Sequence, residues 1–107
     1  DLPIEIRRQV ALGAIAPSAA KHIARVTGVD RYDLAWATID HGLTVREVRA
    51  IAGAAADSSV RAELEARAVP LGHLELELPV DTYRRLRTVA ANRGQTVEEW
   101  IGAAIDG

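Results

Sequence analysis

The string G-x-T-V-x-E occurs twice in the chain, as GLTVRE at residues 42–47 and as GQTVEE at residues 94–99. Glycine suits the left-handed residue that ends a helix. Threonine followed three residues later by glutamate forms a capping box at the start of the next helix. Each string therefore predicts a joint between two helices. The first string follows three helical segments and the second follows an alternating segment and one helix, so we interpret them as shared local chemistry and not as an internal repeat.

The composition favours packed helices over a β-sandwich. The 107 residues are 49% hydrophobic and include no Phe, Met or Cys, so a core must be built from Ala, Leu, Val and Ile. Without Cys the chain has no disulfide, no thiolate metal site and no Cys nucleophile. The length suits one ordinary domain or two very small ones.

The first 68 residues show apolar positions at helical spacing, separated by proline and glycine. A fifth helical stretch, SSVRAELEARA at 58–68, has little apolar content beyond Val60 and Leu64 and is predicted to be a solvated connector. The four earlier helices are predicted between Pro3 and Gly13, between Pro17 and Gly28, from an Asp30 cap to Gly42, and onward from a Thr44 cap.

The period changes at HLELELP, residues 73–79, where apolar and polar residues alternate strictly. Such alternation predicts a strand with one buried face. Two helices follow, one from about residue 80 to Gly94 and one from Thr96. A strand and two helices are too small to bury a core alone, and a lone strand leaves its backbone groups unpaired. The segment therefore predicts two chains that pair their strands in an antiparallel ribbon.

The stretch LELELPVDTYRRLRTVAANRGQTVEEWIGAAI resembles a ribbon-helix-helix domain of the MetJ/Arc/CopG type. In that family the solvent-facing strand residues read DNA, and the matching residues here are His73, Glu75 and Glu77. Because carboxylates are repelled by DNA phosphates, we expect dimerisation, with DNA reading by this ribbon as the alternative. The resemblance implies a dimer interface formed by Leu74, Leu76, Leu78, Leu86, Val97, Trp100, Ile101 and Ile105.

The region before the connector resembles the helices of ParB-type partition proteins that follow the helix-turn-helix. The likeness rests on Leu2, Pro3 and Ile6, then Gly13, and most of all on GLTVRE with Ile39 three residues before it. The resemblance implies a role in DNA binding, with the main DNA reader expected in sequence preceding Asp1. The candidate DNA contacts are Arg7, Arg8, Ser18, Lys21, Arg46 and Arg49.

The charge distribution agrees with DNA contact by the first part only. Residues 1–56 carry seven basic and six acidic side chains, whereas residues 73–107 carry four and six. His22, His41 and His73 lack metal-ligand spacing, and no phosphate-binding loop or nucleophile–base pair is recognisable. We therefore expect no catalytic residue, metal or cofactor, and a chain that is not an enzyme.

Together these patterns predict a mainly α chain with a helical bundle over residues 1–56, a helical connector over 57–72 and a ribbon-helix-helix domain over 73–107. The expected function is that of a ParB-like partition protein, a cytoplasmic homodimer associated with the nucleoid or a plasmid. Its expected partners are DNA and a partition ATPase, with no membrane. The alternative is a ribbon-helix-helix repressor or antitoxin that reads an operator with its ribbon and binds a partner through its first helices.

Overall fold

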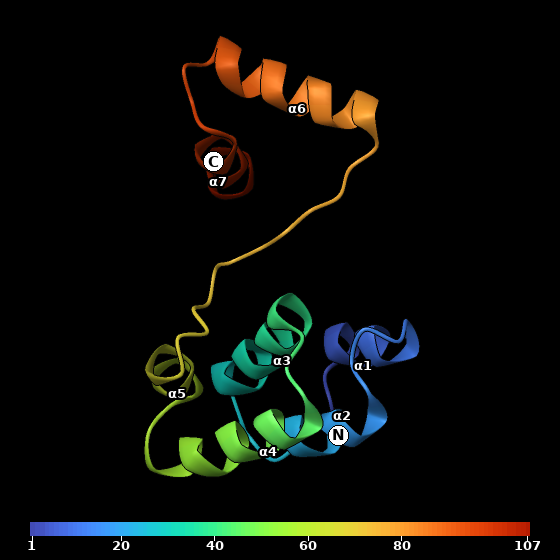
Figure 1. Cartoon of the computed structure of the whole chain (residues 1–107), viewed down its shortest axis with the longest axis vertical. Helices are drawn as coiled ribbons and strands as arrows, with labels where there is room; N and C mark the ends of the chain where they lie inside the picture. The colour runs from blue at the N-terminus through green and yellow to red at the C-terminus, as the bar shows by residue number, and fades with distance from the viewer. The chain divides into compact units, whose positions relative to one another are not determined.

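A computed structural model describes all 107 residues and contains helices and no β-strand, which confirms a mainly α chain (Figure 1). Contacts divide the chain into two compact units, residues 1–74 and residues 75–107. None of the helices combines the length and apolar character needed to cross a bilayer. The elements are α1 (Ile4–Ala11), α2 (Pro17–Ile23), α3 (Val29–His41), α4 (Val45–Ala54), the 3₁₀ turn η1 (Ala55–Asp57), α5 (Val60–Ala66), α6 (Val80–Asn92) and α7 (Val97–Asp106).

The first unit has a continuous core of aliphatic side chains. Helix α2 packs most extensively against α4, and α3 and α4 both pack against α5. Fifteen buried apolar residues form the core, and six of these are Ala. The side chains with no exposed surface include Ile6, Ile23, Leu34, Ile51 and Leu64. The chain therefore builds its core without Phe or Met, by bringing helices together over short side chains.

Helix α5 belongs to this core, so the prediction of a solvated connector is wrong for residues 60–66. Val60 and Leu64 are completely buried, and they lie four residues apart on the face that meets α3 and α4. Ser59 caps the helix by accepting a hydrogen bond from the Ala62 N–H at 3.0 Å. A two-turn helix needs only one pair of apolar residues at this spacing to dock.

Both predicted helix joints are confirmed. Thr44 Oγ1 accepts from the Glu47 N–H at 3.1 Å while Glu47 Oε1 accepts from the Thr44 N–H at 2.9 Å. Thr96 and Glu99 repeat this box with distances of 3.1 and 2.8 Å. Gly42 and Gly94, which precede the two boxes, have φ of 61° and 65°. These left-handed values explain the requirement for glycine.

The predicted Asp30 cap is wrong by two residues, because α3 begins at Val29 and its N-cap is Gly28. Asp30 lies instead in the first turn of α3, where a carboxylate is favoured by the helix dipole.

The ribbon-helix-helix fold with its two-stranded antiparallel ribbon is wrong, because residues 73–79 form no strand. Leu74 and Leu76 remain 61% and 55% exposed. Alternation makes a strand only where a neighbouring edge completes the hydrogen bonds, and the chain supplies no such edge. Pro79 then serves as the N-cap of α6. Residues 75–107 form a pair of packed helices, α6 and α7, preceded by this irregular segment.

Replacing Thr44 by alanine removes the acceptor of the Glu47 N–H at the start of α4. We expect the free energy of unfolding of the first unit to fall by about 1 kcal/mol, measured by urea denaturation followed by circular dichroism. Thr44→Ser keeps the accepting oxygen and should stay close to the wild type. An equal loss in both variants would contradict a stabilising role for the cap.

Candidate nucleic-acid interface

The six side chains predicted to contact DNA are all exposed and come from three helices of the first unit. None of the basic residues among them takes part in an ion pair. Arg7 and Arg8 lie on α1, Ser18 and Lys21 on α2, and Arg46 and Arg49 on α4.

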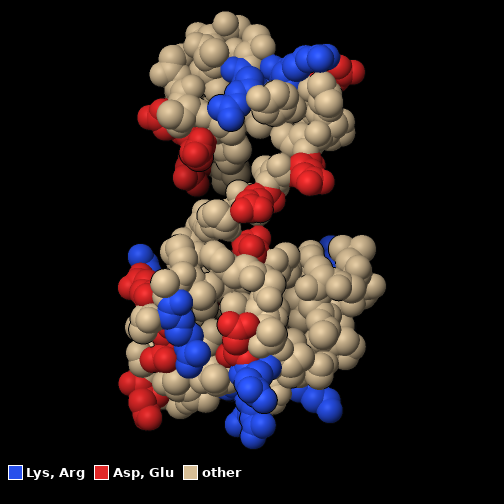
Figure 2. Space-filling model, in the orientation of Figure 1, with Lys and Arg blue, Asp and Glu red and all other residues tan.

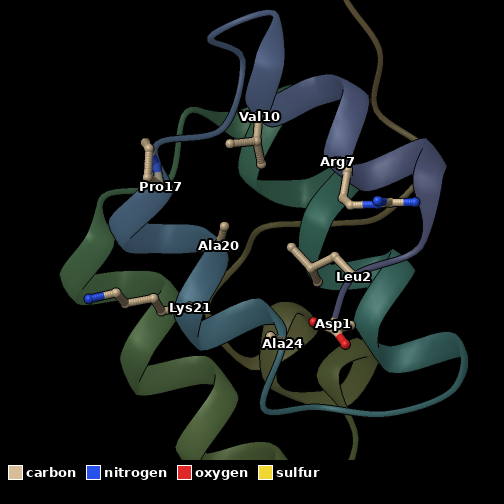
Figure 3. Close-up of a pocket in the computed structure, with 8 residues that line it drawn as sticks. All are labelled: Asp1, Leu2, Arg7, Val10, Pro17, Ala20, Lys21 and Ala24. Atoms are coloured by element: carbon tan, nitrogen blue, oxygen red, sulfur yellow. The ribbon is translucent and has the colours of Figure 1, made fainter.

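The contact between α2 and α4 places the cations of these two helices on adjacent elements. Arg46 and Arg49 are three positions apart on α4, so they share one helix face, and both are exposed. Lys21 extends from α2 toward the ribbon of α4 (Figure 3). Residues of both helices that face the core are buried, namely Ala19, Ala20, Ile23, Val48, Ile51 and Ala52.

Figure 2 shows Lys and Arg side chains gathered along the lower edge of the first unit, the edge along which α4 runs in Figure 1. Positive charge at one edge attracts polyanions even when the unit as a whole is neutral. Residues 1–74 contain nine basic and nine acidic side chains, so the separation of charge matters here and the total does not.

Arg25 is a further candidate that the sequence analysis missed. It is exposed, has no ion-pair partner, and follows α2 in a continuing helical turn, where its N–H donates to the His22 carbonyl at 3.1 Å. Its spacing of four residues from Lys21 and seven from Ser18 was the available signal. We define the α2–α4 basic face as Lys21, Arg25, Arg46 and Arg49.

Arg31, in contrast, already donates hydrogen bonds to three backbone carbonyl groups of the first unit. Its Nε donates to the Val26 carbonyl at 2.8 Å, and its two terminal nitrogens donate to Ala24 at 3.0 Å and to Asp1 at 3.3 Å. The guanidinium thus satisfies two carbonyl groups after the end of α2, where no helical partner remains, and one at the start of the chain. A phosphate would have to displace these bonds, so Arg31 is not part of the basic face.

Helices α2 and α4 carry few acidic side chains, whereas α3 carries three and η1 with α5 carries Asp57, Glu63 and Glu65. Residues 6–29 contain four basic side chains and no Asp or Glu, whereas α3 carries Asp30, Asp33 and Asp40. The only acid on α2 or α4 is Glu47, whose carboxylate is held by the capping box. Hydrogen bonds from Thr44 lower the pKa of Glu47, and this carboxylate is turned to the Thr44 backbone. Helices α2 and α4 therefore carry more basic than acidic side chains, although the unit as a whole has equal numbers of each.

An open hollow of about 400 Å³ lies between the N-terminal residues, α1 and α2. In Figure 3 the apolar side chains of Leu2, Val10 and Ala20 surround it, while the charged ends of Arg7 and Lys21 point away on opposite sides. The two cations do not converge on one point, so the hollow is not an anion pocket. Their arrangement instead suits separate phosphates along a backbone.

The start of α2 is a weaker anion site than the sequence suggested. The helix has seven residues and begins with Pro17, which has no N–H to donate. Ser18 is exposed beside it and remains a candidate only through its hydroxyl.

The structure brings no three His, Asp or Glu side chains close enough to hold a metal ion. The His41 and His73 rings stack with centroids 5.4 Å apart, and His41 Nε2 lies 2.8 Å from the Pro70 carbonyl oxygen. These two contacts connect the segment after α5 to the C-terminal end of α3. His22 lies on α2 with a buried Nδ1 that has no hydrogen-bond partner, and it is far in sequence from the other two.

The first unit is thus an all-helical domain with exposed basic side chains on α2 and α4. The chain belongs to a family of unknown function (DUF7119), whose family model matches residues 1–69. The match covers α1 to α5 and ends five residues before the boundary between the two units. No curated protein and no solved structure matches the chain.

The carboxyl group of Asp33 on α3 links the stability of the first unit to pH. Burial, reinforced by Asp30, raises the pKa of Asp33, while Arg61 lowers it. A folded-state pKa above the unfolded value means that the ionised carboxylate opposes folding at neutral pH. Asp33→Asn should therefore raise the free energy of unfolding at pH 7, by less than about 1 kcal/mol since the group is only partly covered.

The gain should vanish below the ordinary Asp value of 3.8, where the carboxyl is protonated in both states. Urea denaturation of wild type and variant at pH 7 and pH 3 measures it. A loss of stability at pH 7 would show that attraction to Arg61 outweighs burial.

Proposed function

We propose that this chain is a DNA-binding protein whose first unit contacts the phosphate backbone through the α2–α4 basic face. The observation that supports this most is the presence of three exposed cations without ion-pair partners on two helices that pack against each other, with a fourth, Arg25, in the turn directly after α2. The one acid on these helices, Glu47, is already engaged by Thr44. Arg7 and Arg8 on α1 are two further exposed cations without ion-pair partners, and Arg7 points away from Lys21.

Lys and Arg that neutralise phosphates release condensed counterions, so this mode of binding weakens steeply as salt rises. Such contacts position a protein on DNA without reading its sequence. The face offers Lys21, Arg25, Arg46 and Arg49, so log K should fall against log salt with a slope of roughly −3 to −4 for one unit.

We further propose that the DNA binding serves partition, in the cytoplasm at the nucleoid or a plasmid, with a partition ATPase as partner. The support is the GLTVRE string and its resemblance to ParB-type proteins, together with the position of Arg46 within that string on the basic face. The alternative of a repressor reading its operator with a ribbon loses its reading element, because residues 73–79 form no strand.

Binding to a random-sequence 30-base-pair duplex, followed by fluorescence anisotropy between 50 and 200 mM NaCl, tests the proposal. The variant Lys21→Ala/Arg25→Ala/Arg46→Ala/Arg49→Ala should bind at least tenfold more weakly at 50 mM NaCl and lose most of the salt slope. All four side chains are exposed, so the fold should survive, which circular dichroism checks.

The matched control is Arg61→Ala/Arg67→Ala on and beside α5, where Arg61 already pairs with Glu65 at 3.1 Å. It should bind DNA like the wild type. Absence of wild-type binding at 50 mM NaCl, or an equal loss in the control, would overturn DNA binding by this face. For partition, cross-linking of the full-length protein in its host should enrich discrete DNA loci, and a uniform distribution would contradict that role.

A further inference from the structure

Residues 75–107 have almost no core of their own. This unit contains ten large apolar side chains, and none of them is fully buried; its only buried residue is Ala90. The first unit, by comparison, buries fifteen apolar residues in one cluster. Units of about this size rarely hold a fold without a metal, a disulfide or a partner chain, and this chain has no Cys and no metal cluster.

The uncovered side chains lie at helical spacing on both helices. On α6, Tyr83, Leu86 and Val89 follow one another at intervals of three residues, and Tyr83 is 50% exposed. On α7, Ile105 is 77% exposed and Trp100 is only partly covered. A hollow of about 380 Å³ opens at the start of α6 and would accept an apolar side chain, since four of its five lining residues are Leu76, Leu78, Val80 and Tyr83 and only Glu77 is charged.

The two helices carry opposite charge. Helix α6 with its C-cap residue bears four Arg and one Asp, whereas α7 bears Glu98, Glu99 and Asp106 and no basic residue. Of the arginines only Arg84 forms an ion pair, with Asp81 at 3.4 Å in the same helix. A surface with both signs, arranged as two separate helices, is complementary to itself when one copy is turned over.

We propose that a second copy of this chain covers the apolar face of residues 75–107, with α6 of each copy lying against α7 of the other. A two-fold axis makes each of these contacts twice, so the positive and negative helices meet in both places. An anionic lipid surface does not fit, because α7 would be repelled by it.

This proposal goes beyond DNA binding and does not depend on it, since the α2–α4 basic face belongs to the other unit. Sedimentation velocity of the full chain from about 1 to 100 μM tests it, and the wild type should be a dimer. Ile105→Asp places a charge in the apolar face and should weaken the dimer at least tenfold. Leu12→Asp is the matched control, because Leu12 on the first unit is also 77% exposed, and it should leave the dimer unchanged.

A pair of charge-reversed variants tests the pairing of α6 with α7. Arg85→Glu/Arg87→Glu makes α6 acidic and Glu98→Arg/Asp106→Arg makes α7 basic. Each variant alone should dimerise about tenfold more weakly at low salt. An equimolar mixture should recover mixed dimers, because both α6–α7 contacts of the mixed dimer again join opposite charges. Glu99 is left intact, since it forms the capping box with Thr96.

Three results would overturn the proposal. A wild-type chain that stays monomeric at 100 μM shows that no second copy covers the face, even if another protein binds there. Equal weakening by Ile105→Asp and Leu12→Asp places the contact elsewhere. Variants that weaken the dimer alone but do not recover on mixing show that the charges act between α6 and α7 of one chain.

Discussion

The packing of α2 against α4 is the contact on which the first unit depends. Ala19 and Ala20 on one helix and Ala52 on the other end at Cβ, so the two backbones can approach closely around Ile23 and Ile51. With those sides buried, Lys21, Arg46 and Arg49 are left at the surface. The packing that buries one side of each helix thus also fixes where the cations lie. No separate pocket or loop is needed to position them.

The same capping box begins α4, which packs into a core, and α7, which does not. Thr44 and Thr96 are bonded to their glutamates at nearly the same distances. Helix α4 then buries Val48 and Ile51, whereas α7 has no buried residue. The cap determines where a helix begins, and only the residues beyond it determine whether that helix finds a core. The two strings also differ at one exposed position, which is Arg46 in the first and Glu98 in the second.

Much of the helical architecture could be predicted from glycine, proline and threonine, because these residues act locally on the backbone. Gly42, Gly94 and both threonine caps were found in this way. The strand over residues 73–79 was not a local property, since it required an edge that the chain does not provide. The docking of α5 was also missed, because a stripe of only Val60 and Leu64 is too short for periodicity to distinguish a core helix from a connector.

The candidate site could likewise be predicted only in part, because some of its features depend on the tertiary structure. Five exposed cations were named from the resemblance, whereas Arg25 was missed although it lies within the second predicted helix, between Pro17 and Gly28. The spacing from Lys21 points to Arg25, but it does not show that Arg25 is exposed and that Arg31 is bonded to three carbonyl groups. That distinction depends on how the turn between α2 and α3 folds back, which is a property of the tertiary structure.

The irregular segment between α5 and α6 has a consequence for how the chain can be cut. Residues 73–79 have no regular structure and are mostly exposed, which is typical of sites of proteolytic nicking. No Lys or Arg occurs between Arg67 and Arg84, so trypsin has no target in this segment. Glu75 and Glu77 lie within it, and a glutamate-specific protease would therefore release the DUF7119 region and the α6–α7 pair as separate fragments.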